Sequence, residues 1–484
     1  MRERKLDVLL INPGSRRAVY QNLGELFSAI EPPSLAGLFA TYLRKKGRGV
    51  DILDAHALAL DGQGVAQLYH NYEPKLVVIV VYGYQPSAST QNMPAAQDVA
   101  KALKEWYPEC VIMMTGTHPS ALPERTLAEG SVDCVCSGEG PDAIERTLQR
   151  LDSGQKPLPI VRGENIEALD QRMPGVSWDL LPMNEYRAHN WHCFEHIDRR
   201  SPYASIHTTL GCPFRCNFCC INAPFGGPSY RRWSPRKVGE ELELLVCEYG
   251  VRNVKFVDEM FVLHRAHVFG VCDEIIARGL GDALNIWAYA RIDTIKDDYL
   301  EKLRRAGFRW LALGIESGSK HVRDGSEKGR FGNVDILNTV ARVKAAGINV
   351  IGNYIFGLPD DTMTSMTETL SLAKEANCEF ANFYSAMAYP GSKLYEVAKV
   401  RRWALPDDPD GPGWIGYSQH AYETLPLPTE HLSAAEVLAF RDNAFTDYFR
   451  DTNYLNMVER KFGYDVRAHV VLMAHQSMQR KILA

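Results

Sequence analysis

Short apolar runs alternate with amphipathic stretches over residues 1–150. The apolar runs are rich in Val and Ile and are continuous, a pattern typical of strands buried on both faces of a parallel sheet. Helix-length segments such as SLAGLFATYLRKKG separate them, as parallel connections require. We therefore predict an α/β domain with a doubly wound parallel sheet. Its predicted strands are DVLLINP (7–13), VDIL (50–53), LVVIVVYG (76–83), VIMMTG (111–116) and VDCVCSG (132–138).

A strand followed by a helix recurs six times over residues 201–400. Six consecutive βα units predict a partial barrel of the TIM type, in which the chemistry takes place at the C-terminal ends of the strands. The predicted strands are SIHTTL (205–210), VKFVDE (254–259), NIWAYAR (285–291), WLALGIE (310–316), VIGNYIFG (350–357) and FANFYSA (380–386).

The two remaining segments have weaker patterns. Residues 151–200 carry Pro, Gly and charged residues without periodicity, and we predict a linker anchored at WDLLP (178–182). Residues 401–484 open with a Pro/Asp/Gly-rich loop and continue as helices, the first with Ser433 as its expected N-cap. From its position in the chain, we expect this helical region to cover one side of the barrel mouth.

Composition narrows the class of protein. The 484 residues are 45% hydrophobic and 23% charged, which is typical of a folded protein with two or three domains. The net charge of −5 gives no basic surface for a nucleic-acid partner, and no apolar run approaches the roughly 18 residues of a membrane span. Eleven cysteines, most of them single within apolar segments, fit a reducing compartment, so we expect a cytoplasmic protein.

Three cysteines indicate the chemistry. Cys212, Cys216 and Cys219 lie at CxxxCxxC spacing in TTLGCPFRCNFCCI, directly after a predicted strand. A cubane iron–sulfur cluster normally takes four Cys ligands, so three thiolates leave one iron open to another ligand. Zinc is the alternative, although zinc sites prefer CxxC pairs with a distant second pair, and no such partner lies nearby. Cys220 adjoins the motif and is expected to pack.

This cysteine motif, with Phe218 just before its last Cys, resembles that of the radical S-adenosylmethionine (SAM) superfamily. The resemblance implies a 4Fe–4S cluster held by the three cysteines, whose free iron chelates SAM, with Phe218 beside it. Reductive cleavage of SAM would give a 5′-deoxyadenosyl radical, with a reduced flavodoxin or ferredoxin as electron donor. The segments IESGS and IFGLPDDT are also similar to segments of this family.

Polar or small residues end the predicted barrel strands, and the resemblance implies that they bind SAM. Glu259 would receive its ammonium group, and Arg291 would hold its carboxylate through two parallel hydrogen bonds. Glu316 and Ser317 would bond the ribose hydroxyls, and Gly357 would let the backbone approach the adenine closely.

Each of these residues also has an ordinary structural interpretation. Asp258 and Glu259 are adjacent strand-end charges, and the sequence does not select Glu259 between them. Arg291 has Asp293 as a possible ion-pair partner, and Glu316 precedes a helix that it would cap. The agreement of six strand ends with one ligand favours the SAM site.

A doubly wound domain placed before such a barrel resembles the cobalamin-dependent class, often called class B, whose N-terminal domain is flavodoxin-like. The segments EPPSLAGLFATYLRKKG, GTHPSALPE and SGEGPDAIE are similar to that domain. Many cobalamin domains carry DxHxxG after the first strand. Here Asp54-Ala55-His56 follows the second strand instead, so we expect no histidine from this domain on the cobalt. The residues expected to bind cobalamin are Asn12, Pro13, Ser87, Ser89, Gly116, Thr117, His118, Gly138, Glu139 and Gly140.

The resemblance implies a cobalamin-dependent radical SAM methyltransferase with a small-molecule substrate. Methylcobalamin, charged by one SAM, would deliver its methyl group to an unactivated carbon from which the radical of a second SAM had removed hydrogen. A cobalamin-dependent cyclase or rearrangement enzyme is the enzymatic alternative, and a redox or cobalamin sensor is the other. The predicted domains are a cobalamin-binding domain (1–150), a linker (151–200), a radical SAM partial barrel (201–400) and a helical C-terminal domain (401–484).

Overall fold

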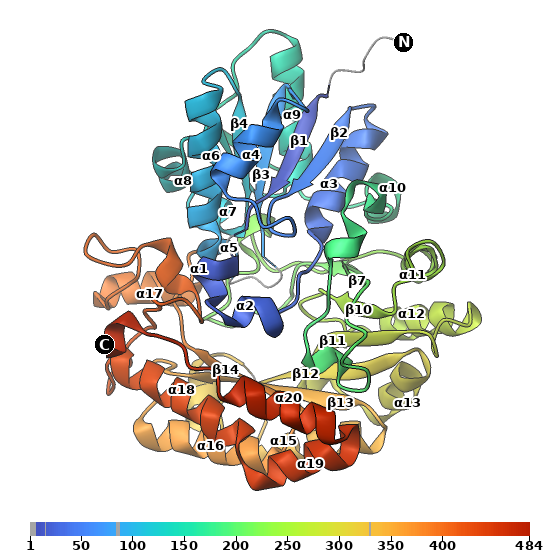
Figure 1. Cartoon of the computed structure of the whole chain (residues 1–484), viewed down its shortest axis with the longest axis vertical. Coiled ribbons are helices and arrows are strands. Elements are labelled where there is room, and N and C mark those ends of the chain that lie inside the picture. Colours follow the sequence, from blue (N-terminus) through green and yellow to red (C-terminus); the bar gives the residue numbers. More distant parts are fainter. Residues whose placement is uncertain (1–5, 15, 84–87, 329–330) are drawn as a thin grey trace.

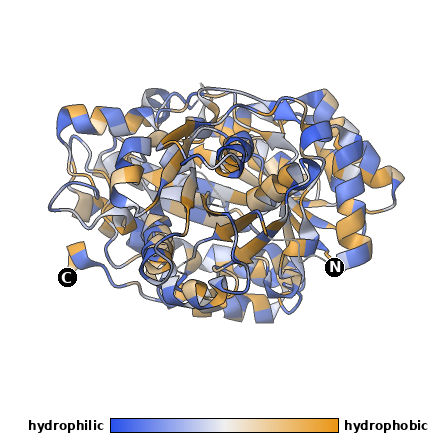
Figure 2. Cartoon of the chain, turned by 90° about the horizontal axis from the view of Figure 1, so that it is seen from above, coloured by the Kyte–Doolittle hydropathy of each residue, from blue (hydrophilic) through white to orange (hydrophobic). Residues whose placement is uncertain are grey.

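The computed structural model describes residues 6–14, 16–83, 88–328 and 331–484. Two six-stranded sheets lie one above the other, with the C-terminal helices along the lower edge of the second sheet (Figure 1). Seen from above, the central strands are mostly apolar and the surrounding helices carry both apolar and polar positions (Figure 2). The helices therefore bury the sheets and turn their polar positions outward.

The N-terminal sheet has the strand order β2-β1-β3-β4-β5-β6, and all of its strand pairs are parallel. This is the flavodoxin-like order with one strand added, which confirms the predicted doubly wound fold. The added strand β6 lies within the segment predicted as a linker. The sequence did not predict this strand, because three residues are too short to form a recognisable apolar run. The strands are β1 (Val8–Asn12), β2 (Val50–Asp54), β3 (Leu76–Val81), β4 (Ile112–Gly116), β5 (Cys134–Ser137) and β6 (Ile160–Arg162).

Alternate residues of β1 explain the two layers of helices around this sheet. Val8 and Leu10 pack into the cluster that contains residues of α3 and α9, while Leu9 and Ile11 pack into the cluster that contains residues of α4 and α6. The helices are α1 (Arg16–Tyr20), α2 (Leu23–Leu26), α3 (Ser34–Lys45), α4 (Gly62–Tyr69), α5 (Ala88–Gln91), α6 (Met93–Trp106), α7 (Thr117–Ala121), α8 (Pro123–Glu129), α9 (Gly140–Asp152) and α10 (Leu169–Arg172).

The second sheet is an open half-barrel with the order β14-β13-β12-β11-β10-β7, and its strand pairs are parallel, as predicted. The prediction of a single strand over 205–210 is wrong. The chain leaves the sheet after β7, and β8 (Thr209–Leu210) pairs antiparallel with β9 (Arg231–Arg232). The half-barrel strands are β7 (Tyr203–Ile206), β10 (Asn253–Phe256), β11 (Asn285–Arg291), β12 (Phe308–Glu316), β13 (Asn349–Phe356) and β14 (Phe380–Ser385).

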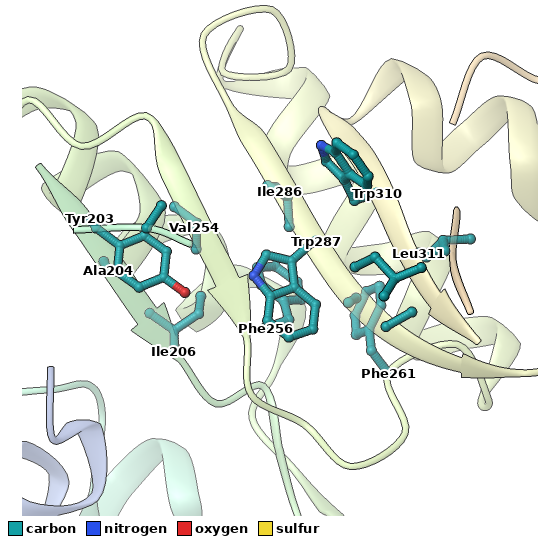
Figure 3. Packing of buried hydrophobic residues seen from close by; sticks show 14 of the residues in the cluster. Tyr203, Ala204, Ile206, Val254, Phe256, Phe261, Ile286, Trp287, Trp310 and Leu311 are labelled. Atoms are coloured by element: carbon teal, nitrogen blue, oxygen red, sulfur yellow. The ribbon is translucent and has the colours of Figure 1, made fainter. Parts of the chain in front are cut away.

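Aromatic residues fill the core around the half-barrel. The ring centroids of Phe256 and Phe261 are 4.9 Å apart, and Phe261 stacks on Phe308 at 5.1 Å. Figure 3 shows Phe256 and Phe261 together with apolar residues of the neighbouring strands. This packing holds the strands whose C-terminal ends form the candidate site.

Helices cover the half-barrel and continue into the C-terminal region. They are α11 (Pro235–Tyr249), α12 (Arg265–Ala277), α13 (Asp297–Arg305), α14 (Lys320–Gly325), α15 (Asn333–Ala345), α16 (Met363–Ala376), α17 (Lys393–Arg401), α18 (Ala434–Phe449), α19 (Thr452–Phe462) and α20 (Tyr464–Ala474). The 3₁₀ turns within the described ranges are η1 (Trp178–Leu180), η2 (Met183–Glu185), η3 (Trp191–Cys193), η4 (Ala223–Phe225), η5 (Ile292–Thr294), η6 (Trp414–Tyr417) and η7 (Lys481–Leu483).

Two local predictions about these segments are confirmed. Ser433 caps α18, because its Oγ accepts a hydrogen bond from the Glu436 N–H at 3.3 Å. Trp178 anchors its segment, since it is buried and its Nε1–H donates to Glu241 Oε1 at 3.0 Å. None of the helices in the described ranges is long and apolar enough to cross a membrane.

Candidate active site

The cysteine loop follows β8 and is held by its own hydrogen bonds. The Cys212 N–H donates to Asn222 Oδ1 at 3.4 Å, and the Cys219 N–H donates to the Cys216 carbonyl at 3.1 Å. Burial raises the pKa of the Cys212 thiol to about 11, so its thiolate form depends on nearby positive charge. Three thiols on one loop beside cationic side chains match the donor set of a cubane with one open iron.

The three cysteine thiols are not arranged as the ligands of a single metal ion would be. Across the described ranges, no group of three His, Cys, Asp or Glu side chains is arranged to hold one ion. In a cubane each thiolate binds a different iron, so its ligands do not need to converge on one point. The three thiols are of the donor type and number that a cubane with one open iron requires.

Asp258 and Glu259, at the end of β10, have different surroundings. Asp258 is 1% exposed and accepts hydrogen bonds from the backbone N–H groups of Thr208 and Thr209, at 2.6 and 2.9 Å. These bonds hold the turn that leads into the cysteine loop. Glu259 lines a cavity beside Cys219, and burial raises the pKa of its carboxyl to about 8. Of the two carboxyls, Glu259 is the one available to a ligand.

Arg291 ends β11 and reaches toward the cysteine loop. Its guanidinium makes two hydrogen bonds of 2.9 Å to the Asp293 carboxylate, lies 4.1 Å from the ring centroid of Phe214 and places Nη1 3.8 Å from Cys216 Sγ. Arg291 therefore has the ion pair with Asp293 that its ordinary interpretation requires, and it also borders the cavity. Its positive charge therefore lies directly beside the sulfur of Cys216.

Glu316 ends β12 in a strained conformation. Its φ of +66° is in the left-handed region, and the register with β13 shifts between Gly314 and Glu316. The Glu316 carboxylate pairs with the Lys328 ammonium at 2.6 Å, and both side chains are at most 10% exposed. The irregular strand end thus directs the paired Glu316 carboxylate and Lys328 ammonium toward the cavity.

A cavity of about 240 Å³ brings these groups together at the C-terminal ends of the half-barrel strands. Phe218, Cys219, Glu259, Arg291 and Glu316 all line it. Tyr289 and Tyr384 form another part of its wall. The predicted neighbours of the cluster therefore share one space.

Two predicted SAM residues do not line this cavity. Ser317 is fully buried, its Oγ lies 3.2 Å from Thr369 Oγ1, and it accepts a hydrogen bond from the Ser319 N–H. Gly357 has a φ of +82°, and an added Cβ would lie 2.4 Å from Val437 Cγ1. Ser317 thus connects β12 to α16, and Gly357 allows α18 to pack closely.

Asn12 and Thr117 line small cavities between the two sheets. Asn12 borders one of about 20 Å³ and Thr117 one of about 40 Å³, and both cavities also contact His207 of the half-barrel domain. A larger groove of about 760 Å³ lies near the ends of β1 and β2 and is lined by Gly14, Arg16 and other residues. These spaces are at the edge where doubly wound sheets bind their ligands.

The other described cobalamin candidates are used in packing. An added Cβ at Gly116 would meet the Val81 carbonyl oxygen at 2.0 Å, at Gly138 the Gly163 oxygen at 2.6 Å, and at Gly140 the Phe39 ring at 2.5 Å. These glycines therefore admit neighbouring protein groups on the side where a Cβ would project. Pro13 is buried and borders none of the described cavities.

The polar candidates also have protein partners. Ser89 donates to the Val81 carbonyl and accepts from the His118 N–H at 2.9 Å. His118 is 1% exposed with its ring centroid 4.4 Å from that of Trp414, and burial lowers its pKa to about 3. Glu139 forms a buried ion pair with Arg231 at 2.6 Å, which connects the two sheets' domains. Ser87 lies outside the described residues.

Lys328, Tyr289 and Tyr384 also line the cavity, and the sequence pattern assigned none of them to the SAM site. Tyr289 lies two residues before Arg291 on β11 and so faces the same side, a signal that strand alternation would have supplied. Lys328 is 12 positions from its partner Glu316, and no local pattern predicts that pairing.

Two protein families match separate parts of the chain. Residues 206–373 match the Radical SAM superfamily, and residues 28–148 match the B12 binding domain. The first match contains the cysteine loop and the strand ends of the cavity wall as far as β13. The second contains most of the N-terminal sheet.

Curated relatives and solved structures extend the comparison. An uncharacterized methyltransferase of Pyrococcus horikoshii is 28% identical over 410 residues, covering 81% of this chain and 83% of the relative. An anaerobic magnesium-protoporphyrin IX monomethyl ester cyclase of Rubrivivax gelatinosus is 25% identical over 410 residues, covering 80% and 69%. The fold is similar to that of the radical SAM methyltransferase TsrM from Kitasatospora setae, solved with tryptophan substrate and a SAM analog. Its TM-score is 0.69 at 17% identity, over 97% of this chain and 98% of that chain.

Proposed function

Because the chain belongs to the cobalamin-dependent radical SAM enzymes, we propose that it is a methyltransferase that moves a methyl group from SAM to an unactivated carbon of a small molecule. The observation that carries this proposal is one cavity bordered by the cysteine loop, Glu259 and Arg291, next to a B12 binding domain. A sensor would not need this cavity, and the relatives named above are enzymes.

The cofactors of this enzyme are a 4Fe–4S cluster, SAM and cobalamin. When bound, they supply the radical and carry the methyl group. We assign the cluster to Cys212, Cys216 and Cys219. Arg291 keeps positive charge beside the sulfur of Cys216, and Asp293 fixes the orientation of its guanidinium.

The chain's own groups would orient SAM in the cavity. Glu259 is the carboxylate we assign to its ammonium group, because Asp258 is occupied by the turn before the cysteine loop. Glu316 remains the candidate for the ribose hydroxyls, with Lys328 holding its carboxylate in place. The apolar walls from Phe218 and Tyr289 exclude water around the reacting atoms.

For cobalamin, we assign the spaces near the strand ends of the N-terminal sheet. Asn12 and Thr117 border the two small cavities between the domains, and the groove of about 760 Å³ offers room for a larger part of the cofactor. The Asn12 side-chain amide donates to Asp54 at 2.8 Å, which fixes its orientation. In this assignment the remaining candidates within the described ranges hold the shape of the site.

A reduced flavodoxin or ferredoxin is our proposed electron donor, in the cytoplasm. All eleven cysteines are free thiols, as a reducing compartment favours. Reduction of the reconstituted enzyme by each purified donor, followed by SAM cleavage, tests this assignment. Failure of both proteins where dithionite succeeds would contradict it.

Anaerobic turnover with SAM that carries a deuterated methyl group tests the proposed reaction. We expect S-adenosylhomocysteine and 5′-deoxyadenosine in equal amounts, and a product that contains the deuterated methyl group. 5′-Deoxyadenosine without any S-adenosylhomocysteine would contradict methyl transfer. It would favour the second candidate, a cobalamin-dependent cyclisation, which the similarity to the Rubrivivax gelatinosus cyclase supports.

A further inference from the structure

A second cavity adjoins the one described above, and it has no role in cluster or SAM binding. Its volume is about 210 Å³, and it shares Tyr289 and Tyr384 with the first cavity as a common wall. Its floor consists of inward residues of β10, β11 and β14, and the N-terminal segment around Phe27 and the helix α18 close it. We call it the aromatic cavity.

The aromatic cavity has mostly ring side chains and little charge of its own. Trp191, Trp287 and Phe380 line it, and their rings lie close together, with centroid distances of 5.2 Å and 5.7 Å from Trp191. Its charged Lys255 is paired with Glu31 at 3.1 Å, so this pair adds no net charge. Such a surface favours an apolar ring system as its occupant.

One wall of the aromatic cavity carries an excess of positive charge. Arg441 lines it and donates to Asp442 Oδ1 at 2.7 Å, and Arg480 donates to both oxygens of Asp442 at 2.9 and 3.0 Å. Both guanidiniums are at most 5% exposed. Within the described ranges, neither arginine has an ion pair with any carboxylate other than Asp442. Two buried cations therefore share one anion.

The histidine on this wall does not balance the charge. His420 lies beside Arg441, with Nε2 3.4 Å from Nη2, and burial together with both arginines holds its pKa well below the usual value. It is therefore neutral at physiological pH. Backbone carbonyls also accept hydrogen bonds from this pair, from Arg441 at Phe383 and from Arg480 at Gln419 and Ala421. These neutral groups leave a net positive charge on the wall, and a buried net charge favours an anionic ligand.

We propose that the aromatic cavity binds the substrate, and that this substrate is a compact aromatic carboxylic acid. Its carboxylate would face Arg441, and its ring would lie toward Tyr289 and Tyr384, which separate it from the SAM cavity. This inference rests on the proposed function and adds a substrate class to it. A volume of about 210 Å³, below the roughly 300–1,000 Å³ of sites for drug-sized ligands, favours a compact ligand over an extended ring system.

The arginine pair allows a matched test of this proposal. Arg441→Gln leaves Asp442 paired with Arg480, so no buried carboxylate loses its partner. Arg480→Gln removes the same charge from the same cluster, but Arg480 does not line the cavity. Circular dichroism and thermal unfolding would verify that both variants are folded before binding is measured.

The probes are indole-3-propionate and phenylpropionate, and the control for each acid is its neutral primary amide. Binding is measured by equilibrium dialysis with the unreduced holoenzyme in the presence of SAM. We expect the wild type to bind at least one acid about tenfold more tightly than its amide. Arg441→Gln should abolish that preference and leave amide binding unchanged, and Arg480→Gln should retain most of it. Equal binding of acid and amide, or no binding of either acid below about 1 mM, would overturn the proposal.

A second readout separates the substrate from the other anion that this site could attract, the phosphate of cobalamin. Absorption spectra after desalting report how much cobalamin each variant retains. We expect Arg441→Gln to retain as much as the wild type. Loss of cobalamin with an unchanged acid preference would assign the charge to the cofactor and contradict our inference. Because the dialysis needs no turnover, its result is independent of whether methyl transfer occurs.

Discussion

Polar residues at the strand ends of the half-barrel and at those of the N-terminal sheet have opposite surroundings. At the half-barrel, Glu259 and Arg291 border a cavity of about 240 Å³ together with the cysteine loop. At the N-terminal sheet, Ser89 and Glu139 are bound to other protein groups, and the adjoining cavities hold about 20 and 40 Å³. The strand-end groups of one domain border open space, and those of the other are bonded to protein groups within and between the domains.

This difference has a physical cause. The half-barrel is open, and at its strand ends the side chains leave a cavity of about 240 Å³ unfilled. The N-terminal sheet instead presses its strand ends against the half-barrel domain through two buried ion pairs, Glu139–Arg231 and Glu31–Lys255. A buried charge needs a partner, so these groups are unavailable to a ligand.

The largest effect is expected at the cysteine loop. Cys212→Ala removes one of three cluster ligands and should lower SAM cleavage by at least about three orders of magnitude, since the remaining thiols cannot hold the cluster. The measurement is 5′-deoxyadenosine formed after dithionite reduction. Cys220→Ala, at a buried neighbour outside the motif, should stay within about tenfold of the wild type. Cleavage that survives in Cys212→Ala would refute the ligand assignment.

The interdomain ion pair should give the next largest effect, on stability. Glu139→Gln leaves the Arg231 guanidinium buried without its carboxylate, which costs about 3–5 kcal/mol of unfolding free energy. Denaturant unfolding followed by Trp fluorescence measures it. The double variant Glu139→Gln/Arg231→Gln is the control and should recover part of the loss, because no unpaired charge remains. If the single variant is as stable as the wild type, Glu139 is free for a ligand and the contrast between the two domains fails.

Within the half-barrel, the adjacent carboxyls provide a sharper comparison. Glu259→Gln should weaken SAM binding by about 10–100-fold with little change in stability, because its carboxylate faces the cavity. Asp258→Asn should lower the free energy of unfolding by about 1–3 kcal/mol, since Asp258 accepts the backbone bonds of Thr208 and Thr209. Equilibrium dialysis of SAM and denaturant unfolding measure the two effects. The opposite assignment of effects would show that Asp258 is the ligand-facing group.

Much of the fold follows from hydrophobic pattern, and the exceptions are elements too short to form one. The five N-terminal strands and the six βα units have continuous apolar runs. In contrast, β6 has three residues, and β9 consists of Arg231 and Arg232 alone. Their strand conformation comes from pairing with β5 and β8 in the folded protein. No window of sequence contains that information.

The site was predictable where the signal is local. The cysteine motif depends on spacing within eight residues, and apart from the strand predicted over 205–210 the predicted strand ends lie within about three positions of the observed ones. The choice between Asp258 and Glu259 depends on the backbone of Thr208, 50 positions away. The glycines at the ends of the N-terminal strands were ambiguous for a similar reason. Gly116 and Gly138 do permit close approach, but the group that approaches is protein backbone.

The smallest expected effect concerns Glu241. Its side chain joins α11 to the linker, because it accepts hydrogen bonds from the Val176 N–H at 2.9 Å and from the Trp178 indole N–H at 3.0 Å. Burial raises the pKa of its carboxyl from 4.5 to about 7, so the folded state holds this proton more tightly than the unfolded chain does. Its contribution to stability is therefore fully present below pH 4.5 and is lost as the pH rises toward 7.

Glu241→Gln keeps an acceptor oxygen for both donors and removes the titration. Relative to the wild type, the variant should gain about 1–2 kcal/mol of unfolding free energy between pH 5 and pH 8, a value reduced for the partial exposure of the side chain. Denaturant unfolding of both proteins across this range measures the difference. A gain that is constant with pH, or one that grows toward acid, would mean that the Glu241 carboxyl is solvated. The contact between the linker and α11 would then be open to solvent, as the cavity-lining strand ends of the half-barrel are, and it would differ from the buried interdomain ion pairs.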